Sequence, residues 1–397
     1  MSSERLVSAI RKLEGKIVLV RLDVNVPMAG KKVLDDSRLR AALPTLRYIE
    51  RHGGRVIMVG HLGRPAGKIS AALSLKPIGY VLGKLLRQPI KVLDLSLGAK
   101  AIKRVAMAGP VLLENIRFSA GEETNDAALA KALASLANIY VNEAFSVSHR
   151  QAASLVAITK YLPSYAGFQL AAEVEALDKI RRQGKKPVVA IIGGAKVADK
   201  LPVIAKLLSR TSVVLTGGAV ANTFLAARGY KVGKSLIDKS VIKSARALLR
   251  RAGKKIILPI DVIVDDTSTP KKEARPRLVE AIKSRESIYD VGIKTTQLYA
   301  PYIKKANTIF WSGTLGKAEL SQWRHATEAL GSLAAAHARG PAFVVIGGGD
   351  TLAFFQQKKL WVDYVSLAGS AMLEFLAGRR LPGLAALGYY SKNLKIK

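Results

Sequence analysis

The stretch of sequence that decides the fold is residues 188–200, VVAIIGGAKVADK. An apolar run of Val and Ile leads directly into two glycines, and a segment of helical period follows. A continuous apolar run of this length is typical of a parallel strand that is buried on both faces. The segment therefore predicts a strand, a tight turn and a helix, which is the repeating unit of open α/β sheets.

The same unit recurs along the whole chain, with helical segments between short runs rich in Val and Ile. The other expected strands are Ile17 to Leu22, Arg55 to Val59, Pro110 to Leu113, Ile139 to Val141, Ser212 to Thr216, Ile256 to Ile260, Thr308 to Trp311 and Phe343 to Ile346. Several of these runs end in Gly, Asp or Asn, and ligands of open α/β sheets bind at the carboxyl ends of the strands. We therefore expect an α/β protein with mainly parallel sheets that are covered on both faces, and a half-site on each of two sheets.

The length of 397 residues suggests two domains. Between the halves, residues 168–182 (FQLAAEVEALDKIRR) form an amphipathic pattern that ends in basic residues before Gly184, as a helix does. We expect an N-terminal domain over residues 1–166 and a connecting hinge helix over 167–183. A C-terminal domain over 184–374 and a segment over 375–397 that packs back toward the N-terminal domain complete the expected organisation.

The charge balance is strongly basic, with 63 Lys and Arg against 29 Asp and Glu, a formal net charge of +34. Two interpretations are open: a polyanion-binding surface, or a general bias in surface composition. The basic residues are spread along the chain without a block of like charge, and aromatic residues do not interleave with them. Nucleic acid is therefore not expected as a specific partner.

The composition excludes several other classes of protein. Zero Cys rules out disulfides, thiolate zinc sites, iron–sulfur clusters and Cys nucleophiles. With 49% hydrophobic and 23% charged residues, the chain is not disordered as a whole. No signal peptide and no apolar stretch long enough to span a bilayer are visible, so we expect a soluble, cytoplasmic protein without a membrane partner.

Arginines in the first half recur at one topological position, just after an expected strand or in a loop beyond one. They are Arg38, Arg64, Arg117 and Arg150. The planar guanidinium matches phosphate and carboxylate geometry, so several at one sheet edge predict a pocket for a small anionic metabolite. For each arginine taken alone, the alternative is an ordinary surface ion pair.

The second half repeats a strand, glycine and helix pattern that suits phosphates. After Gly193 and Gly194 come Lys196 and Lys200, which share a helix face beside free N–H groups. The pattern is not a Walker A loop and is weakly specific by itself. The stretch Gly347 to Thr351 repeats it with a carboxylate, so Asp350 is a candidate for a phosphate-bound Mg²⁺, the alternative being a helix N-cap.

Other kinds of chemistry lack their motifs. No His-x-x-x-His pair or carboxylate cluster indicates a catalytic metal, and no G-x-S-x-G elbow indicates a serine nucleophile. What remains is the positioning of anions, which suits phosphoryl transfer because that reaction depends on alignment and neutralisation of charge.

Taken in order, these motifs resemble the phosphoglycerate kinase family almost from end to end. The stretches that carry the resemblance are RLDVNVP (21–27), Arg38 with AALPT (41–45), HLGRP (61–65), ENIRF (114–118), GGAKVADK (193–200), NTF (222–224), GKSL (233–236) and GGGDT (347–351). The resemblance implies reversible phosphoryl transfer between 1,3-bisphosphoglycerate and Mg-ADP, giving 3-phosphoglycerate and Mg-ATP. It also implies two Rossmann-like three-layer domains that close around a central cleft, and a monomer.

The resemblance assigns roles by position. The implied phosphoglycerate-binding residues are Asp23, Asn25, Arg38, His61, Leu62, Gly63, Arg64, Arg117 and Arg150. The implied nucleotide-binding residues are Gly194, Lys196, Lys200, Gly217, Gly218, Glu319, Gly348, Gly349, Asp350 and Thr351. Glu319 would contact the ribose and Asp350 the Mg²⁺, while Arg38, Lys196 and Lys200 would be the catalytic residues.

The chain departs from the family pattern at a few sites. Asn142-Glu143-Ala144-Phe145 has Glu where the family has Asp, Ser312-Gly313-Thr314 replaces Asn-Gly-Pro, and Gly316-Lys317-Ala318-Glu319 replaces Gly-Val-Phe-Glu. In the loop SLAGSAM (366–372), two of the family's three glycines are replaced. An alternative therefore stays open: a diverged relative with little turnover that binds phosphometabolites, nucleotides or polyanions.

Overall fold

The computed structural model of the chain describes residues 5–10, 12–266 and 273–391. Residues 1–4, where a leader would begin, and residues 392–397 of the expected C-terminal segment lie outside that part. By its internal contacts the chain divides into two compact units, Met1–Glu175 with Arg380–Lys397, and Ala176–Arg379. The division falls inside helix α5 (Phe168–Gln183). No helix of the described residues is long and apolar enough to cross a membrane.

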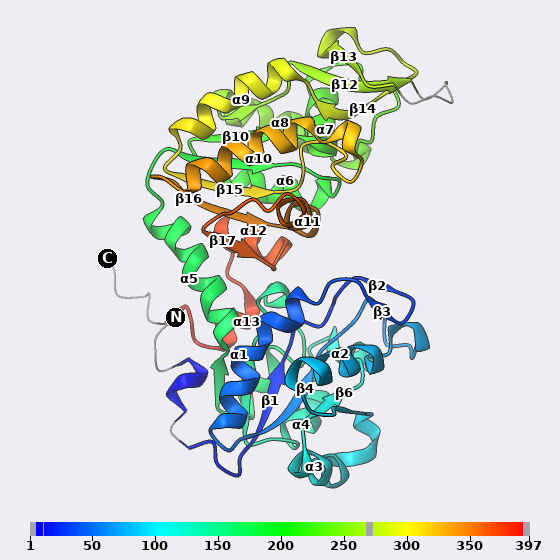
Figure 1. Ribbon diagram of the computed structural model, residues 1–397, viewed down its shortest axis with the longest axis vertical. Coiled ribbons are helices and arrows are strands. Elements are labelled where there is room, and N and C mark those ends of the chain that lie inside the picture. Colours follow the sequence, from blue (N-terminus) through cyan, green and yellow to red (C-terminus); the bar gives the residue numbers. More distant parts are fainter. Residues whose placement is uncertain (1–4, 11, 267–272, 392–397) are drawn as a thin grey trace. The chain divides into compact units, whose positions relative to one another are not determined.

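The first unit is built on a parallel sheet of six strands in the order β5-β6-β4-β1-β7-β8 (Figure 1). Their bounds are β1 (Ile17–Arg21), β4 (Arg55–Val59), β5 (Lys91–Leu93), β6 (Val111–Leu113), β7 (Ile139–Asn142) and β8 (Ser164–Ala166). All five residues of β1 are buried, including Arg21 at its carboxyl end. A strand without an exposed face needs cover on both sides of its sheet.

Helices supply that cover on the two faces of the sheet. Their bounds are α1 (Ser37–Arg51), α2 (Lys76–Leu86), α3 (Gly98–Ala108) and α4 (Ala127–Ala134). One apolar cluster joins Val18 and Val20 of β1 to α1 and α2, and a second joins Leu19 to α3 and α4. Because successive strand residues point to opposite faces, this alternation produces three layers. Helix α13 (Pro382–Ala386) belongs to the same unit, and the Gly383 N–H donates to the Ser148 carbonyl at 2.9 Å.

The second unit repeats the plan with a parallel sheet in the order β11-β10-β9-β15-β16-β17 (Figure 1). Its strands are β9 (Val188–Ile192), β10 (Val213–Thr216), β11 (Ile256–Ile257), β15 (Thr308–Ser312), β16 (Phe343–Gly347) and β17 (Tyr364–Ser366). Helices α9 (Ile293–Lys305), α10 (His325–Ala338) and α11 (Gly349–Gln357) share one apolar cluster with alternate residues of β9, β10, β15 and β16. Helix α6 (Val197–Leu207) packs against α7 (Gly218–Arg228), α8 (Ile242–Ala252) and α12 (Ser370–Leu376).

Two small antiparallel elements complete the sheets of the described residues. One is the sheet β13-β12-β14 of the second unit, with β12 (Asp261–Asp266), β13 (Arg275–Leu278) and β14 (Glu286–Val291). The other is the hairpin of β2 (Met28–Ala29) and β3 (Lys32–Val33) in the first unit. The expected α/β class with mainly parallel sheets is thus confirmed.

Every strand expected from the sequence is present, with differences at the sheet edges. The run Ile256 to Ile260 forms a strand only over Ile256–Ile257, because Pro259 follows and has no N–H to donate to a ladder. Strands β5, β8 and β17 were not expected from the sequence; each has three residues and lies at the edge of its sheet, and so short a run carries little periodicity. The antiparallel strands β2, β3, β12, β13 and β14 were not expected either.

Asp290, near the end of β14, is a buried carboxyl group that caps a helix. Its Oδ1 accepts a hydrogen bond from the Val291 N–H at 2.9 Å, and its Oδ2 accepts one from the Ala326 N–H in the first turn of α10 at 3.1 Å. Burial raises the pKa of Asp290 from 3.8 to about 7, against these hydrogen bonds, which lower it. The native state therefore binds a proton near neutral pH that the unfolded chain does not.

This difference predicts how stability depends on pH. The contribution of Asp290 is greatest below pH 4 and is lost as the pH rises toward 7, by at most about 1.4 kcal/mol per pH unit. In Asp290→Asn the group cannot titrate, so the wild-type protein should gain stability over the variant as the pH falls from 7.5 to 5. Urea unfolding at four pH values measures that difference, and a constant difference would refute the raised pKa.

Candidate functional site

In the first unit, three segments meet at Asp23, directly beyond β1. The carboxylate oxygen Oδ2 of Asp23 accepts hydrogen bonds from Arg38 Nη1 and from Ser146 Oγ, each at 2.6 Å. Arg38 lies in the first turn of α1, and Ser146 lies in the short helix after β7. A carboxylate held from both sides fixes the direction of the Arg38 guanidinium, which remains 28% exposed.

The loop beyond β4 is held by neighbouring polar groups. The Gly63 N–H donates to Asn25 Oδ1 at 3.0 Å, and the Gly63 carbonyl accepts from Arg117 Nη1 at 2.7 Å. The Leu62 side chain is buried in the core, and its carbonyl accepts from Asn115 Nδ2 at 2.7 Å. Arg64 is exposed at the end of this loop. The backbone of the loop is therefore fixed by Asn25, Asn115 and Arg117.

Arg117 and Arg150 share one acidic neighbour. The Glu123 Oε1 atom lies 3.4 Å from Arg117 Nη2 and 3.9 Å from Arg150 Nη1. These side chains line a cavity of about 40 Å³ together with Arg21 and Glu122. Burial, followed by the charge of Arg150, lowers the pKa of Arg117 to about 10. Two carboxylates face three guanidinium groups here, so the cluster keeps a net positive charge and favours an added anion.

His61 lies between these cations in an enclosed position. The ring is 2% exposed, and its Nδ1 lies 3.0 Å from Arg21 Nη2. Burial comes first among the causes that lower the pKa of His61 well below its usual value, and the charges of Arg21, Arg117, Arg150 and Arg38 add to it. Because a guanidinium is always protonated, Nδ1 must accept this bond and the ring proton sits on Nε2. Sequence reasoning missed this role of Arg21, because the residue ends an apolar run.

In the second unit, glycines let the loops beyond three strands pack directly against one another. A Cβ on Gly193, after β9, would lie 2.0 Å from the Thr314 carbonyl oxygen beyond β15. A Cβ on Gly217, after β10, would lie 2.6 Å from Leu315 Cα. Gly218 has a φ of +55° and a Cβ there would lie 2.8 Å from the Gly194 nitrogen. Only glycine fits these positions, so the loops form a closely packed layer of backbone at the carboxyl edge of the sheet.

Lys200 joins this layer of backbone to the end of β15. Its Nζ donates to the Gly193 carbonyl and lies 3.5 Å from the Ser312 carbonyl. Burial lowers the pKa of Lys200 to about 8, while the charge of Asp350 raises it and that of Lys196 lowers it. Lys196 and Lys200, which lie four residues apart at the start of α6, and Asp350, in the first turn of α11, are therefore close enough for their charges to interact.

Asp350 is an exposed residue in the first turn of α11, and the N-cap of that helix is Gly348 at φ +97°. The alternative that Asp350 is merely the N-cap is therefore wrong. Thr351 Oγ1 accepts from the Gly313 N–H at 2.7 Å, which ties α11 to the loop beyond β15. Glu319 is exposed farther along that loop, where the Lys317 N–H donates to the Tyr289 carbonyl at 2.8 Å.

A single exposed carboxylate suits a metal ion that arrives with its phosphate ligand. Within the described ranges, no group of three or more His, Asp and Glu side chains could hold a metal ion alone. Mg²⁺ needs one or two carboxylates when phosphate oxygens and water complete its shell. Asp350 fits that requirement because it faces solvent beside two lysines that would contact the same phosphates.

The loop with replaced glycines keeps the one glycine that its backbone requires. Gly369 has a φ of +54°, whereas Ala368 and Ser370 are not among the described residues with positive φ. The two replacements therefore do not strain the backbone. Helix α12 begins directly afterwards, at Ser370.

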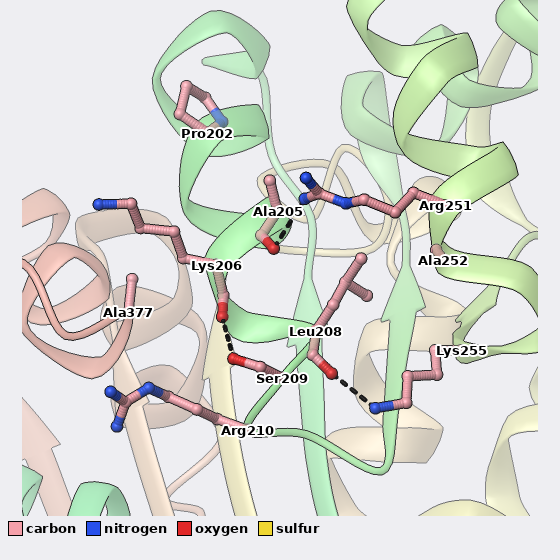
Figure 2. A pocket seen from close by; sticks show the side chains of 10 residues that line it. All are labelled: Pro202, Ala205, Lys206, Leu208, Ser209, Arg210, Arg251, Ala252, Lys255 and Ala377. Atoms are coloured by element: carbon pink, nitrogen blue, oxygen red, sulfur yellow. Dashed lines mark hydrogen bonds between the residues drawn. The ribbon is translucent and has the colours of Figure 1, made fainter.

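The second unit also has a hollow of about 760 Å³ lined by basic residues, shown in Figure 2. It lies at the opposite edge of the sheet, where β10 and β11 begin. Arg251 Nη2 donates to the Ala205 carbonyl at 3.0 Å and Lys255 Nζ to the Leu208 carbonyl at 2.6 Å (Figure 2). These cations complement the negative end of α6, so the hollow has a structural explanation and is not the candidate site.

Comparison with known proteins agrees with this geometry. The sequence profile of the family described as phosphoglycerate kinase matches residues 7–379. The phosphoglycerate kinase of Thermomicrobium roseum is 41% identical over 384 residues, 95% of this chain and 97% of that protein. The solved structure of the Pyrococcus horikoshii phosphoglycerate kinase is similar with a TM-score of 0.86 at 30% identity, covering 98% of this chain and 100% of that one. That of the Coxiella burnetii phosphoglycerate kinase gives 0.81 at 36% identity, covering 96% and 98%.

The contact between Arg21 and His61 predicts the protonation state of the ring. We expect neutral His61 with its proton on Nε2 throughout the neutral pH range, because Nδ1 accepts from a permanent cation. Two-bond ¹H–¹⁵N correlation spectra of protein labelled at histidine measure the tautomer and its titration. His52, which is exposed, serves as the reference ring. A His61 signal that titrates near pH 6.5, or a proton on Nδ1, would contradict the assignment.

Proposed function

The chain belongs to the phosphoglycerate kinase family, and from this premise we propose which of its residues carry out the reaction. The activity is the reversible transfer of a phosphoryl group from 1,3-bisphosphoglycerate to ADP, a step of glycolysis and gluconeogenesis that leaves 3-phosphoglycerate and ATP. The P–O bond to the acyl oxygen breaks, a bond to the terminal oxygen of ADP forms, and the carboxylate is the leaving group.

The phosphoglycerate binds at the carboxyl edge of the first unit's sheet in this proposal. The observation that supports it most is the set of cations around the neutral His61 ring, whose pKa each of them lowers. Arg64, Arg117 and Arg150 would hold the phosphate at the far end of the substrate, where guanidinium forks match its oxygens. Asp23, Asn25, His61 and the Leu62–Gly63 backbone would orient the carboxyl end toward Arg38.

The nucleotide binds at the corresponding edge of the second unit's sheet. Gly194, Gly217, Gly218, Gly348 and Gly349 let the backbone approach it closely. Lys196, Lys200 and Thr351 would contact the phosphates, and Glu319 the ribose. Asp350 would hold a Mg²⁺ ion, which neutralises charge on the nucleotide phosphates when it is bound.

The transferred group carries charge that fixed cations must balance. Arg38 from one half-site and Lys196 and Lys200 from the other are the residues we assign to this task. Phosphoryl transfer needs alignment and charge neutralisation more than covalent catalysis. An acyl phosphate is also lost to water in an open site, so the reaction requires the two half-sites to come together. Helix α5 is the hinge in this proposal, and the enzyme acts as a cytoplasmic monomer.

A coupled assay of ATP-dependent phosphorylation of 3-phosphoglycerate tests the assignment. The wild-type enzyme should turn over, and Arg38→Ala and Lys196→Ala should each lower kcat by about two to three orders of magnitude, the usual cost of one transition-state donor. Arg40→Ala, an exposed residue of the same helix paired with Asp36, is the matched control and should retain full activity. Folded wild-type protein without turnover would instead favour the alternative of a binding protein.

The lowered pKa of Lys200 predicts a basic limb in the pH profile. As the pH rises through about 8, the ammonium loses its proton and no longer attracts the phosphates. We expect kcat/KM for ATP to fall about tenfold between pH 7 and pH 9, as for the titration of one group. In Lys200→Arg the cation persists, so this limb should flatten even if the rate is lower. An identical limb in the variant would assign the titration to another group.

A further inference from the structure

The first turn of α5 has its free N–H groups satisfied by side chains from two other elements. The Phe168 N–H donates to Thr45 Oγ1 at 2.8 Å. The Gln169 N–H donates to Glu143 Oε1 and the Leu170 N–H to Glu143 Oε2, each at 3.1 Å. Helix starts normally take such caps from the residue just before the helix. Here the cap of α5 comes from α1 and from the residue after β7.

The two capping side chains also contact each other. Thr45 Oγ1 donates to Glu143 Oε1 at 2.5 Å, so one oxygen of the carboxylate serves both α1 and α5. Thr45 and Glu143 are 0% and 3% exposed. A Cβ on Gly167, just before α5, would lie 2.0 Å from Glu143 Oε2. The helix start and the carboxylate are therefore packed as closely as the backbone permits.

The same two elements also meet at the seat of Arg38, by which we mean Asp23 and Ser146, whose hydrogen bonds hold its side chain. Ser146, three residues after Glu143, donates from its Oγ to Asp23 Oδ2. The same oxygen accepts from Nη1 of Arg38, which lies two turns before Thr45 on α1. Helix α1 is thus fixed to the segment 143–146 at two points, through Thr45 to Glu143 and through Arg38 and Asp23 to Ser146. A shift of α1 at one point strains the other.

The electrostatics of Glu143 depend on these bonds. Burial raises its pKa to about 7, and the hydrogen bonds from Thr45, Leu170 and Gln169 oppose that rise. The charged side chains on the elements packed against it have other partners: Arg21 contacts His61, and Arg38 contacts Asp23. On α5, Glu173 lies one turn beyond Gln169 and is contacted by its side chain. The hydrogen bonds of the cap, and not an ion pair, hold the carboxylate in place.

We propose that Thr45 and Glu143 are positioning residues that couple the seat of Arg38 to the start of α5, so that binding of 3-phosphoglycerate changes the stability of that helix start. The coupling rests on the proposed function because it takes Arg38 as a substrate ligand. Neither Thr45 nor Glu143 is among the proposed ligands of the substrate. They act through the hydrogen bonds of Arg38 and Ser146 to Asp23, the backbone of segment 143–146 and the hydrogen bond of Thr45 to Glu143.

Hydrogen exchange tests the coupling without relying on turnover. In the full-length wild-type protein, saturating 3-phosphoglycerate should slow amide exchange at least threefold in peptides that contain residues 168–170. In Thr45→Val, which removes the hydroxyl and keeps the shape, this protection should fall by more than half, and Thr45→Ser should restore it. Thr211→Val is the matched control, because it removes a buried hydroxyl bond to the Leu207 carbonyl in the other unit. Equal protection in wild-type and Thr45→Val protein would overturn the proposal.

Kinetics supply a second measurement, which would not change if Thr45 and Glu143 had a purely structural role. Thr45→Val and Glu143→Gln should lower kcat about fivefold and change KM for 3-phosphoglycerate less than twofold, since the substrate ligands themselves are intact. Glu143→Asp, which keeps the carboxylate on a shorter side chain, is the conservative variant at this position. A raised KM with unchanged kcat would overturn the proposal.

The two proposals fail in different ways. Wild-type protein that neither binds nor phosphorylates 3-phosphoglycerate would refute the proposed site residues. Wild-type protein that is active but whose α5 start is insensitive to 3-phosphoglycerate would refute only the coupling.

Discussion

Burial of both sheets on both faces is the constraint on which the rest of this structure depends. Strand β1 has no exposed residue, and neither has β9, so helices must cover each sheet above and below. Polar groups then have room only where the strands end. Asp23 follows β1, His61 follows β4, Lys196 follows β9 and Asp350 follows β16. The packing of the sheets therefore determines where these polar side chains lie, because the carboxyl ends of parallel strands share one edge.

In the proposed function the two edges hold an anion in different ways. The first unit would use side chains: arginines surround a histidine that burial and their charges keep neutral, and Glu123 balances only part of their charge. The second unit uses backbone: glycines at Gly193, Gly217 and Gly218 let adjacent loops meet at distances that a Cβ would forbid. A three-carbon acid with one phosphate offers few atoms, so long side chains must reach it. A nucleotide is larger and has its phosphates in a row, and this arrangement suits a layer of backbone N–H groups with two lysines.

Much of this could be predicted from sequence, and the rest could not for physical reasons. The strands appear as apolar runs because both faces are buried, and the glycine and arginine positions follow from where the runs end. The edge strands β5, β8 and β17 escaped because three half-buried residues have no clear period. Arg21 and Glu143 escaped because a charged residue at the end of a strand has no pattern that reveals burial. Their partners, His61 and the start of α5, are 40 and 26 residues away along the chain. The altered loop 366–372 could be judged only from its dihedral angles, which show a positive φ at Gly369 and not at Ala368 or Ser370.

The excess charge of +34 divides among several roles. A small share lies at the two ligand edges. Another share lies at helix C-termini, with Arg250 and Arg251 in the last turn of α8 and Lys304 and Lys305 in that of α9, where cations complement the helix dipole. The hollow beside Lys255 shows the same use, since its cations donate to the last carbonyls of α6.

The partial charges at a helix end do not cancel the full charge of such a cation, so the cation still adds to the electrostatic field around the protein. Both substrates are polyanions, and that field attracts them over about one Debye length, roughly 8 Å at physiological salt. We therefore expect residues that stabilise helices also to raise the local concentration of substrate, although none of them is a proposed ligand of it.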